Sequence, residues 1–198
     1  MQTSKLNSSI YIIWTFILLT IFQHIAVILK GPDALISHLS LAFIIFIAII
    51  FWVQFYLNFK NYLKIGDIHA TITRIVICDI VLLMVNVMYT LDSADLVTSN
   101  LDQTSNNILE GVTLTFRLIL LIYNVQLGLR LYNQKDDPEI RNLGLSLILR
   151  MIATIGTAYF KTNATLKPIY HIFILFEVLP WWYTYIIYRK IMISENLH

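Results

Sequence analysis

The sequence predicts an all-α polytopic integral membrane protein, a six-transmembrane-helix bundle that forms one membrane domain over residues 1–198. Hydrophobic residues make up 58% of the chain and charged residues only 13%, whereas a soluble domain carries about 25% charged residues. The mean hydropathy is +0.70. The apolar residues fall in six runs that short polar segments separate. Together these observations indicate that lipid is the solvent for most of the chain.

The length of the runs predicts helices rather than strands. Each run has about 18–25 residues, which at about 1.5 Å per helical residue crosses a hydrocarbon core of about 30 Å. Strands of a membrane barrel would alternate apolar and polar residues over about ten positions. The first run is longer than the core of a signal peptide, about 7–15 residues, so we expect it to be retained. The six expected spans are 10–29, 38–57, 68–91, 108–132, 143–160 and 168–188.

The connecting segments predict the orientation. With six spans, both termini, the second loop and the fourth loop share one side of the membrane. That side holds eight lysines and arginines, whereas the other side holds three. Positive residues concentrate on the cytoplasmic side, so we expect both termini to be cytoplasmic. The eight are Lys5, Lys60, Lys64, Arg130, Lys135, Arg141, Arg189 and Lys190, and the three are Lys30, Lys161 and Lys167.

Composition and motifs exclude several function classes. A net charge of +2 is too small to indicate nucleic-acid binding. The single cysteine, Cys78, excludes an internal disulfide and any multi-cysteine metal site. The sequence has no HExxH, GxSxG or P-loop motif. We therefore expect no cofactor, no bound metal and no enzymatic activity, although an intramembrane lipid enzyme with Asp79 or Glu177 as its acid or base stays open.

The third run departs most from a plain apolar helix, because it contains Arg74, Asp79 and Asn86. Such residues are costly in hydrocarbon, so they usually face protein partners or water and often mark function. Asp79 and Asn86 are seven residues apart and share one stripe of a helix. Arg74 lies about 140° away from Asp79 around the helix, so we expect it to face the cytoplasmic interface, a lipid phosphate or Glu177 instead.

Depth groups the polar residues into two layers. Asp79 lies about 16 Å from the inner end of its span, and Arg117 and Glu177 lie about 13 Å from the outer ends of theirs. All three therefore fall near the midplane, and we expect Asp79 to pair with Arg117 on the neighbouring antiparallel helix. Arg74 and Arg150 lie about 9–10 Å from the inner ends. Asn124, seven residues after Arg117, reaches this lower layer too.

Two further features concern the last two runs. Pro180 lacks a backbone N–H and is expected to kink the sixth helix beside Glu177. Bent helices near midplane charges recur in transporters, but proline is also frequent in ordinary membrane helices. Above Arg150, Ala153 and Gly156 are small enough to allow close approach of another helix, which favours a packing role for this part of the fifth helix.

These residues support two functions of different classes. In the first, the protein is a channel or secondary transporter for an ion, a proton or a small polar solute. Asp79 and Glu177 carry charge, Arg117 sets their affinity, and Asn86, Asn124 and His171 line the route, with Arg74 and Arg150 secondary. In the second, the protein is a non-transporting subunit, sensor or assembly factor whose polar layer binds a partner helix or a lipid. The expected partners are the bilayer, the solute, and either a second copy or another membrane subunit.

Overall fold

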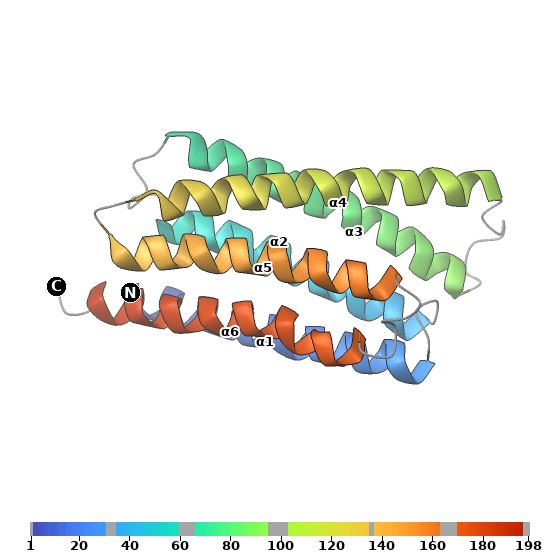
Figure 1. The fold of residues 1–198 in the computed structure, drawn as a ribbon, viewed down its shortest axis with the longest axis horizontal. Helices are drawn as coiled ribbons and strands as arrows, with labels where there is room; N and C mark the ends of the chain where they lie inside the picture. The colour runs from blue at the N-terminus through green and yellow to red at the C-terminus, as the bar shows by residue number, and fades with distance from the viewer. Residues whose placement is uncertain are drawn as a thin grey trace. The chain divides into compact units, whose positions relative to one another are not determined.

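The computed structural model describes residues 2–30, 35–59, 66–94, 103–134, 137–162 and 170–195. It describes no side chain at 2–9, 58–59, 66–67, 93, 103, 157–162, 170–177 and 191–195. The described chain forms six helices joined by short connections (Figure 1), which confirms the all-helical prediction. These are α1 (Gln2–Lys30), α2 (Leu35–Phe59), α3 (Gly66–Ser93), α4 (Gln103–Tyr132), α5 (Pro138–Thr162) and α6 (Tyr170–Glu195).

The helices extend past the apolar runs that predicted them. α5 starts at Pro138, five residues before the expected start, and α4 starts at Gln103 within a polar segment. A helix satisfies its backbone hydrogen bonds internally, so it can continue from hydrocarbon into the polar interface. Apolar composition therefore locates the membrane-crossing part of a helix, not its ends.

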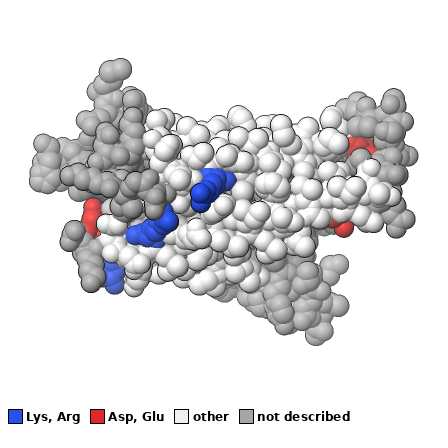
Figure 2. Space-filling view, turned by 90° about the horizontal axis from the view of Figure 1, so that it is seen from above, with Lys and Arg blue, Asp and Glu red and all other residues white. Residues whose placement is uncertain are grey.

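Four helices are long and apolar enough to cross a membrane among the described residues. Their candidate spans are Ile10–Lys30, Leu35–Leu57, Ile68–Asp92 and Thr104–Tyr132. Large apolar side chains are exposed on these helices, for example Phe43, Met84 and Leu114. The visible surface carries few charged side chains between its ends (Figure 2). These features suggest a membrane protein.

By internal contacts, the chain divides into two compact units. The first unit contains Met1–Ile21 and Asn124–His198, and the second contains Phe22–Tyr123. α1 and α4 each contribute one part to each unit, whereas α2 and α3 belong to the second and α5 and α6 to the first. Each unit has its own buried apolar side chains.

In the second unit, α2 and α3 pack side by side in antiparallel directions. Tyr56 near the end of α2 stacks on His69 near the start of α3, with ring centroids 4.6 Å apart. At the opposite end of the pair, the rings of His38 and Tyr89 stack at 6.0 Å. The core between them consists of large side chains, and it includes Phe51, Trp52, Phe55, Ile68, Ile72, Ile75, Leu82 and Val85.

In the first unit, aromatic rings join α1 to α6. Phe16 lies 4.0 Å from Trp181 between ring centroids, and Trp14 makes an edge contact with Trp182 at 5.1 Å. α5 packs along α6, and the start of α1 and the end of α6 lie at the same end of this unit (Figure 1). Burial of such rings is a major source of core stability.

Two glycines allow α4 and α5 to approach closely. A Cβ added at Gly144 would lie 2.5 Å from the carbonyl oxygen of Gly128, and it would also meet the backbone nitrogen of Tyr132. At Gly156, by contrast, an added Cβ would meet nothing within 4 Å among the described residues. The close approach expected near Gly156 is therefore not seen in this part of the chain. It occurs twelve residues earlier on α5, where Gly144 faces Gly128 of α4.

The start of α5 has a well-formed N-terminal cap. The carboxylate Oδ1 of Asp137 accepts hydrogen bonds from the backbone N–H groups of Glu139 at 2.9 Å and Ile140 at 3.1 Å. Pro138 occupies the first helical position, where its missing N–H has no partner to lose. This local signal, Asp-Pro-Glu, explains why α5 begins in a charged connector rather than at the first apolar residue.

Replacing the cap is expected to destabilise the chain modestly. Asp137→Ala should lower the free energy of unfolding by about 1 kcal/mol, because the N–H groups of the first turn lose their acceptor. Asp137→Asn keeps a capping oxygen and should change stability by only a few tenths of a kcal/mol. Denaturant titration in mixed micelles measures both. Equal stability of the alanine and asparagine variants would contradict the capping role.

Candidate functional site

α3 presents one buried face that carries its polar groups. Asp79 is 4% exposed and Asn86 is 6% exposed, and Cys78 beside Asp79 is buried as well. Their spacing of seven residues places Asp79 and Asn86 on one stripe of the helix, as the sequence predicts. α3 therefore holds a carboxyl and a carboxamide about 10 Å apart along its axis, both directed away from the exposed face.

Arg117 does not pair with Asp79 among the described residues. The contact between Arg74 and Tyr123 sets the antiparallel register of α3 and α4, and this register is consistent with Asp79 and Arg117 lying at one level. However, Arg117 is exposed on α4 while Asp79 is buried on α3, and no hydrogen bond or ion pair joins them in this part of the chain. The ion pair expected between Asp79 and Arg117 is therefore not seen among the described residues.

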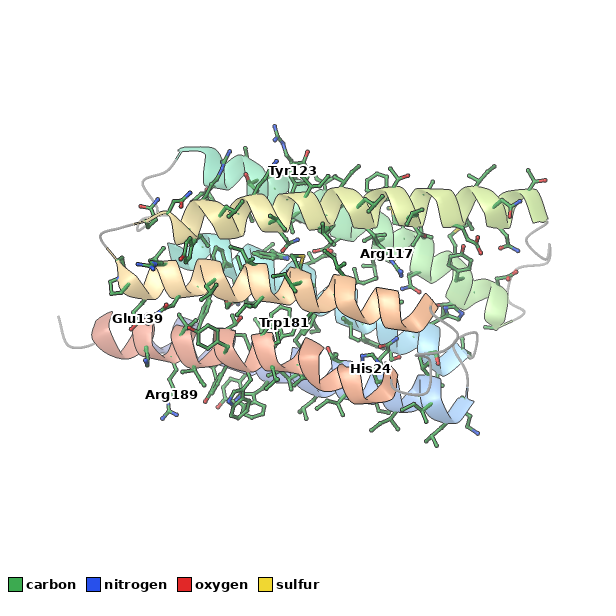
Figure 3. The ribbon with its side chains drawn as sticks, in the orientation of Figure 1. His24, Arg117, Tyr123, Glu139, Trp181 and Arg189 are labelled. Atoms are coloured by element: carbon green, nitrogen blue, oxygen red, sulfur yellow. The ribbon has the colours of Figure 1, made fainter. Side chains whose placement is uncertain are left out.

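A second group of polar residues lies in the first unit and centres on Arg150. Its Nη2 donates a hydrogen bond to Oδ1 of Asn124 at 2.6 Å. The guanidinium lies over the ring of Trp181, 4.6 Å from the centroid. Figure 3 marks Trp181 on α6, where it faces α5. Asn124 is completely buried, so α4, α5 and α6 each supply one group to this cluster, which we name the Arg150 cluster: Asn124, Arg150 and Trp181.

A pair of hydroxyls extends the contact between α5 and α6. Oγ1 of Thr184 lies 3.1 Å from Oγ of Ser146 and 2.8 Å from the carbonyl oxygen of Pro180, and its single hydrogen donates to one of these two acceptors at a time. Ser146 donates to the carbonyl oxygen of Leu143 at 2.7 Å. Ser146 and Thr184 are both buried. Hydrogen bonds of this kind add modestly to helix association in membranes, about 0.6 kcal/mol each on average.

Arg74 differs from the other polar residues of α3 because it is exposed. Its guanidinium lies 5.5 Å from the centroid of the Tyr123 ring on α4. Asp79, five residues later, is buried. Arg74 and Asp79 therefore lie on different faces of α3, as expected.

Two predicted site residues have side chains outside the described residues. Glu177 and His171 lie within the helical backbone of α6, but the structure describes neither side chain. Their predicted roles stay predictions. Pro180 lies inside α6 and is buried. The kink expected there is likewise untested.

Sequence reasoning missed Trp181, Ser146 and Thr184. It placed Arg150 and Asn124 in one layer but assigned neither a partner from α6. A signal was present, because Ser146 lies one helical turn before Arg150 and Thr184 lies three residues after Trp181, so each pair shares one face of its helix. Tryptophan near the end of an apolar run was instead compatible with a membrane interface.

The described side chains give no sign of metal chemistry. No group of three or more histidine, cysteine, aspartate and glutamate residues is placed to hold a metal ion within the described residues. The second unit contains the buried carboxyl of Asp79, and the first unit contains the Arg150 cluster. Neither includes a hydroxyl or thiol that a described base activates.

Comparison with known proteins gives no relative. No family model, no curated protein and no solved structure matches this chain.

Proposed function

We propose that the chain is a six-span membrane protein with cytoplasmic termini that moves an ion, a proton or a small polar solute past Asp79. The observation that carries the proposal is the burial of Asp79, at 4% exposure, inside the candidate span Ile68–Asp92. Ionisable groups inside membrane helices are rare and often mark ion and proton routes.

The geometry of α5 and α6 supports six spans. They have 25 and 26 residues, so each is about 38 Å long and exceeds a hydrocarbon core of about 30 Å. Arg150 raises the cost of inserting α5. Its hydrogen bond to Asn124 and its stacking on Trp181 reduce that cost, because they cover the guanidinium with protein. The start of α1 and the end of α6 lie at the same end of the first unit (Figure 1), as an even number of spans requires.

In this proposal, Asp79 takes up and releases the proton or cation. Asn86 lies two turns further along the same buried face and offers both a donor and an acceptor to a moving ion or water. Arg117 contributes positive charge from α4. The predicted contributions of Glu177, His171 and Asn124 rest on sequence alone.

The substitution Asp79→Asn tests this role in liposomes. Flux of protons or monovalent cations should fall by more than about tenfold, which corresponds to about 1.4 kcal/mol, because the amide cannot ionise. Cys78→Ala is the matched control, since Cys78 is adjacent, equally buried and uncharged. It should keep the wild-type flux. Unchanged flux in Asp79→Asn, with normal folding, would refute the carrier role.

The second candidate is a non-transporting membrane subunit. The specific observation in its favour is the tight packing of the first unit, where backbones of α4 and α5 meet at Gly128 and Gly144 and the Arg150 cluster ties three helices together. Such an arrangement is suited to a rigid scaffold. A chain that shows no flux alone and copurifies with a stoichiometric membrane partner would favour this candidate over transport.

A further inference from the structure

α3 has an exposed face that is apolar from Ile77 onward, whereas its first turns also expose His69 and Thr73. Ile77, Ile80, Met84 and Val87 are exposed at 41–66%, and their spacing of three and four residues places them on one stripe. Arg74 precedes this stripe, lies at its edge toward α4 and is also exposed. In a membrane protein this face contacts acyl chains, so Arg74 is a cation on a lipid-facing surface.

The protein supplies Arg74 with a ring but with no hydrogen-bond acceptor among the described residues. Its described contact is the face of Tyr123, at 5.5 Å, and no hydrogen bond or ion pair to it occurs in this part of the chain. Figure 3 marks Tyr123 on α4. A guanidinium has five N–H donors in a planar fork, and in hydrocarbon each donor without an acceptor is costly. The acceptors therefore come from outside the described protein.

Depth identifies the source of these acceptors. Arg74 lies six residues after Ile68, the first residue of the candidate span, which is about 9 Å along the helix axis. A long arginine side chain extends its charged end from such a depth to the headgroup level. Contact with the Tyr123 ring orients the planar guanidinium of Arg74. A guanidinium oriented in this way can donate two parallel hydrogen bonds to two oxygens of a phosphate.

We propose that Arg74 and Tyr123 form a binding site for the phosphate group of an anionic phospholipid. Charge complementarity argues for this occupant, and so does the end of α3 at which Arg74 lies. That end is the one that the distribution of lysine and arginine assigns to the cytoplasm, where anionic lipids are enriched. The inference rests on the membrane placement proposed above but not on transport.

Lipid titration of the full-length chain in neutral detergent micelles tests the site. Bound phosphatidylglycerol is counted by native mass spectrometry, with phosphatidylcholine and inorganic phosphate as separate arms. Arg74→Gln should weaken the apparent affinity for phosphatidylglycerol about tenfold, the equivalent of one charge-assisted hydrogen bond. Tyr123→Leu should weaken it less, and Tyr123→Phe should leave it unchanged because the ring stays. Inorganic phosphate should not compete at equal concentration.

Arg189→Gln is the matched control for charge. Arg189 is exposed on α6 (Figure 3) and makes no ring contact within the described residues. Its loss removes one positive charge and should leave phosphatidylglycerol affinity unchanged. Arg74→Lys keeps the charge but not the planar guanidinium, so an intermediate affinity is expected. This conservative variant also keeps the test usable if Arg74→Gln fails to fold. Equal affinity in wild type and Arg74→Gln would overturn the site, as would competition by inorganic phosphate.

Two other results separate the possible occupants and functions. A photocrosslinker at position 74 should label lipid in native membranes; stoichiometric labelling of a protein instead would overturn the lipid assignment. Asp79→Asn should keep full lipid affinity. Retained flux in Asp79→Asn would therefore count against the transport proposal alone, and retained phosphatidylglycerol affinity in Arg74→Gln would count against the lipid site alone.

Discussion

Gly144→Ala is expected to lower the free energy of unfolding by about 3 kcal/mol, at the upper end of the cost of overpacking. An added Cβ would lie 2.5 Å from the carbonyl oxygen of Gly128 and 2.9 Å from the carbonyl carbon of Leu131. These are backbone atoms, so no side chain can rotate to make room, and α4 and α5 must move apart. Denaturant titration in mixed micelles at fixed detergent concentration measures the loss.

Gly156→Ala is the matched control on the same helix. Its Cβ would meet nothing within 4 Å, and alanine favours a helix over glycine by about 1 kcal/mol. This variant should therefore be as stable as wild type or slightly more stable. If both alanine variants behaved alike, α4 and α5 would not be in backbone contact at Gly128 and Gly144.

The Arg150 cluster is the site of the second large effect. Asn124→Leu is expected to destabilise the protein by about 2–3 kcal/mol, because it removes a 2.6 Å hydrogen bond to a charged group and leaves the guanidinium with one acceptor fewer. Arg150→Met should cost about 1–3 kcal/mol, because the carboxamide of Asn124 is completely buried and loses its donor. Unfolding in mixed micelles measures each loss.

A double-mutant cycle separates the pair from its surroundings. The double variant Asn124→Leu with Arg150→Met should lose less stability than the two single losses added, with a coupling of about 1–2 kcal/mol. Arg141→Met, nine residues earlier on α5, is the control. Arg141 is exposed, donates a long hydrogen bond of 3.5 Å to the phenol oxygen of Tyr132 and lies 5.0 Å from the centroid of that ring. Such exposed contacts are weak, so its loss should stay within about 1 kcal/mol. Additive losses for Asn124 and Arg150 would contradict their contact.

The two large effects bear on the choice between the candidate functions. Both concern the first unit, where close backbone contact and a hydrogen-bonded cation make the helices difficult to separate. The second unit holds the buried carboxyl and the exposed arginines on α3 and α4. A defect of stability without loss of flux in the first-unit variants, and the opposite result in Asp79→Asn, would assign structural and transport roles to different residues.

Helix number and helix type followed from the sequence because lipid imposes simple rules. A run of about 20 apolar residues must satisfy its backbone internally, so six runs predicted six helices, and the described chain has them. Helix ends were harder to predict. The beginning of α5 depends on the cap at Asp137, a local feature that the apolar pattern does not report.

Spacing along a single helix was also informative. The seven-residue interval between Asp79 and Asn86 placed both on one face of α3, and both are buried. The same argument failed for Arg117 and Asn124. They are also seven residues apart on α4, yet Arg117 is exposed and Asn124 is completely buried. Very little of the α4 span is buried, so a shared stripe does not ensure shared neighbours.

The sequence by itself determined the helical class, the apolar character of the helices and the spacing of the polar residues along each helix, because these depend on composition and on a fixed rise per residue. Only the tertiary structure decided which polar groups meet. Arg150 reaches Asn124 and Trp181, and Arg117 does not reach Asp79 among the described residues. Contacts between helices depend on how each one is rotated about its axis. Packing sets that rotation, and the decisive contact here is between two glycines, which carry no side chain to mark a facing surface.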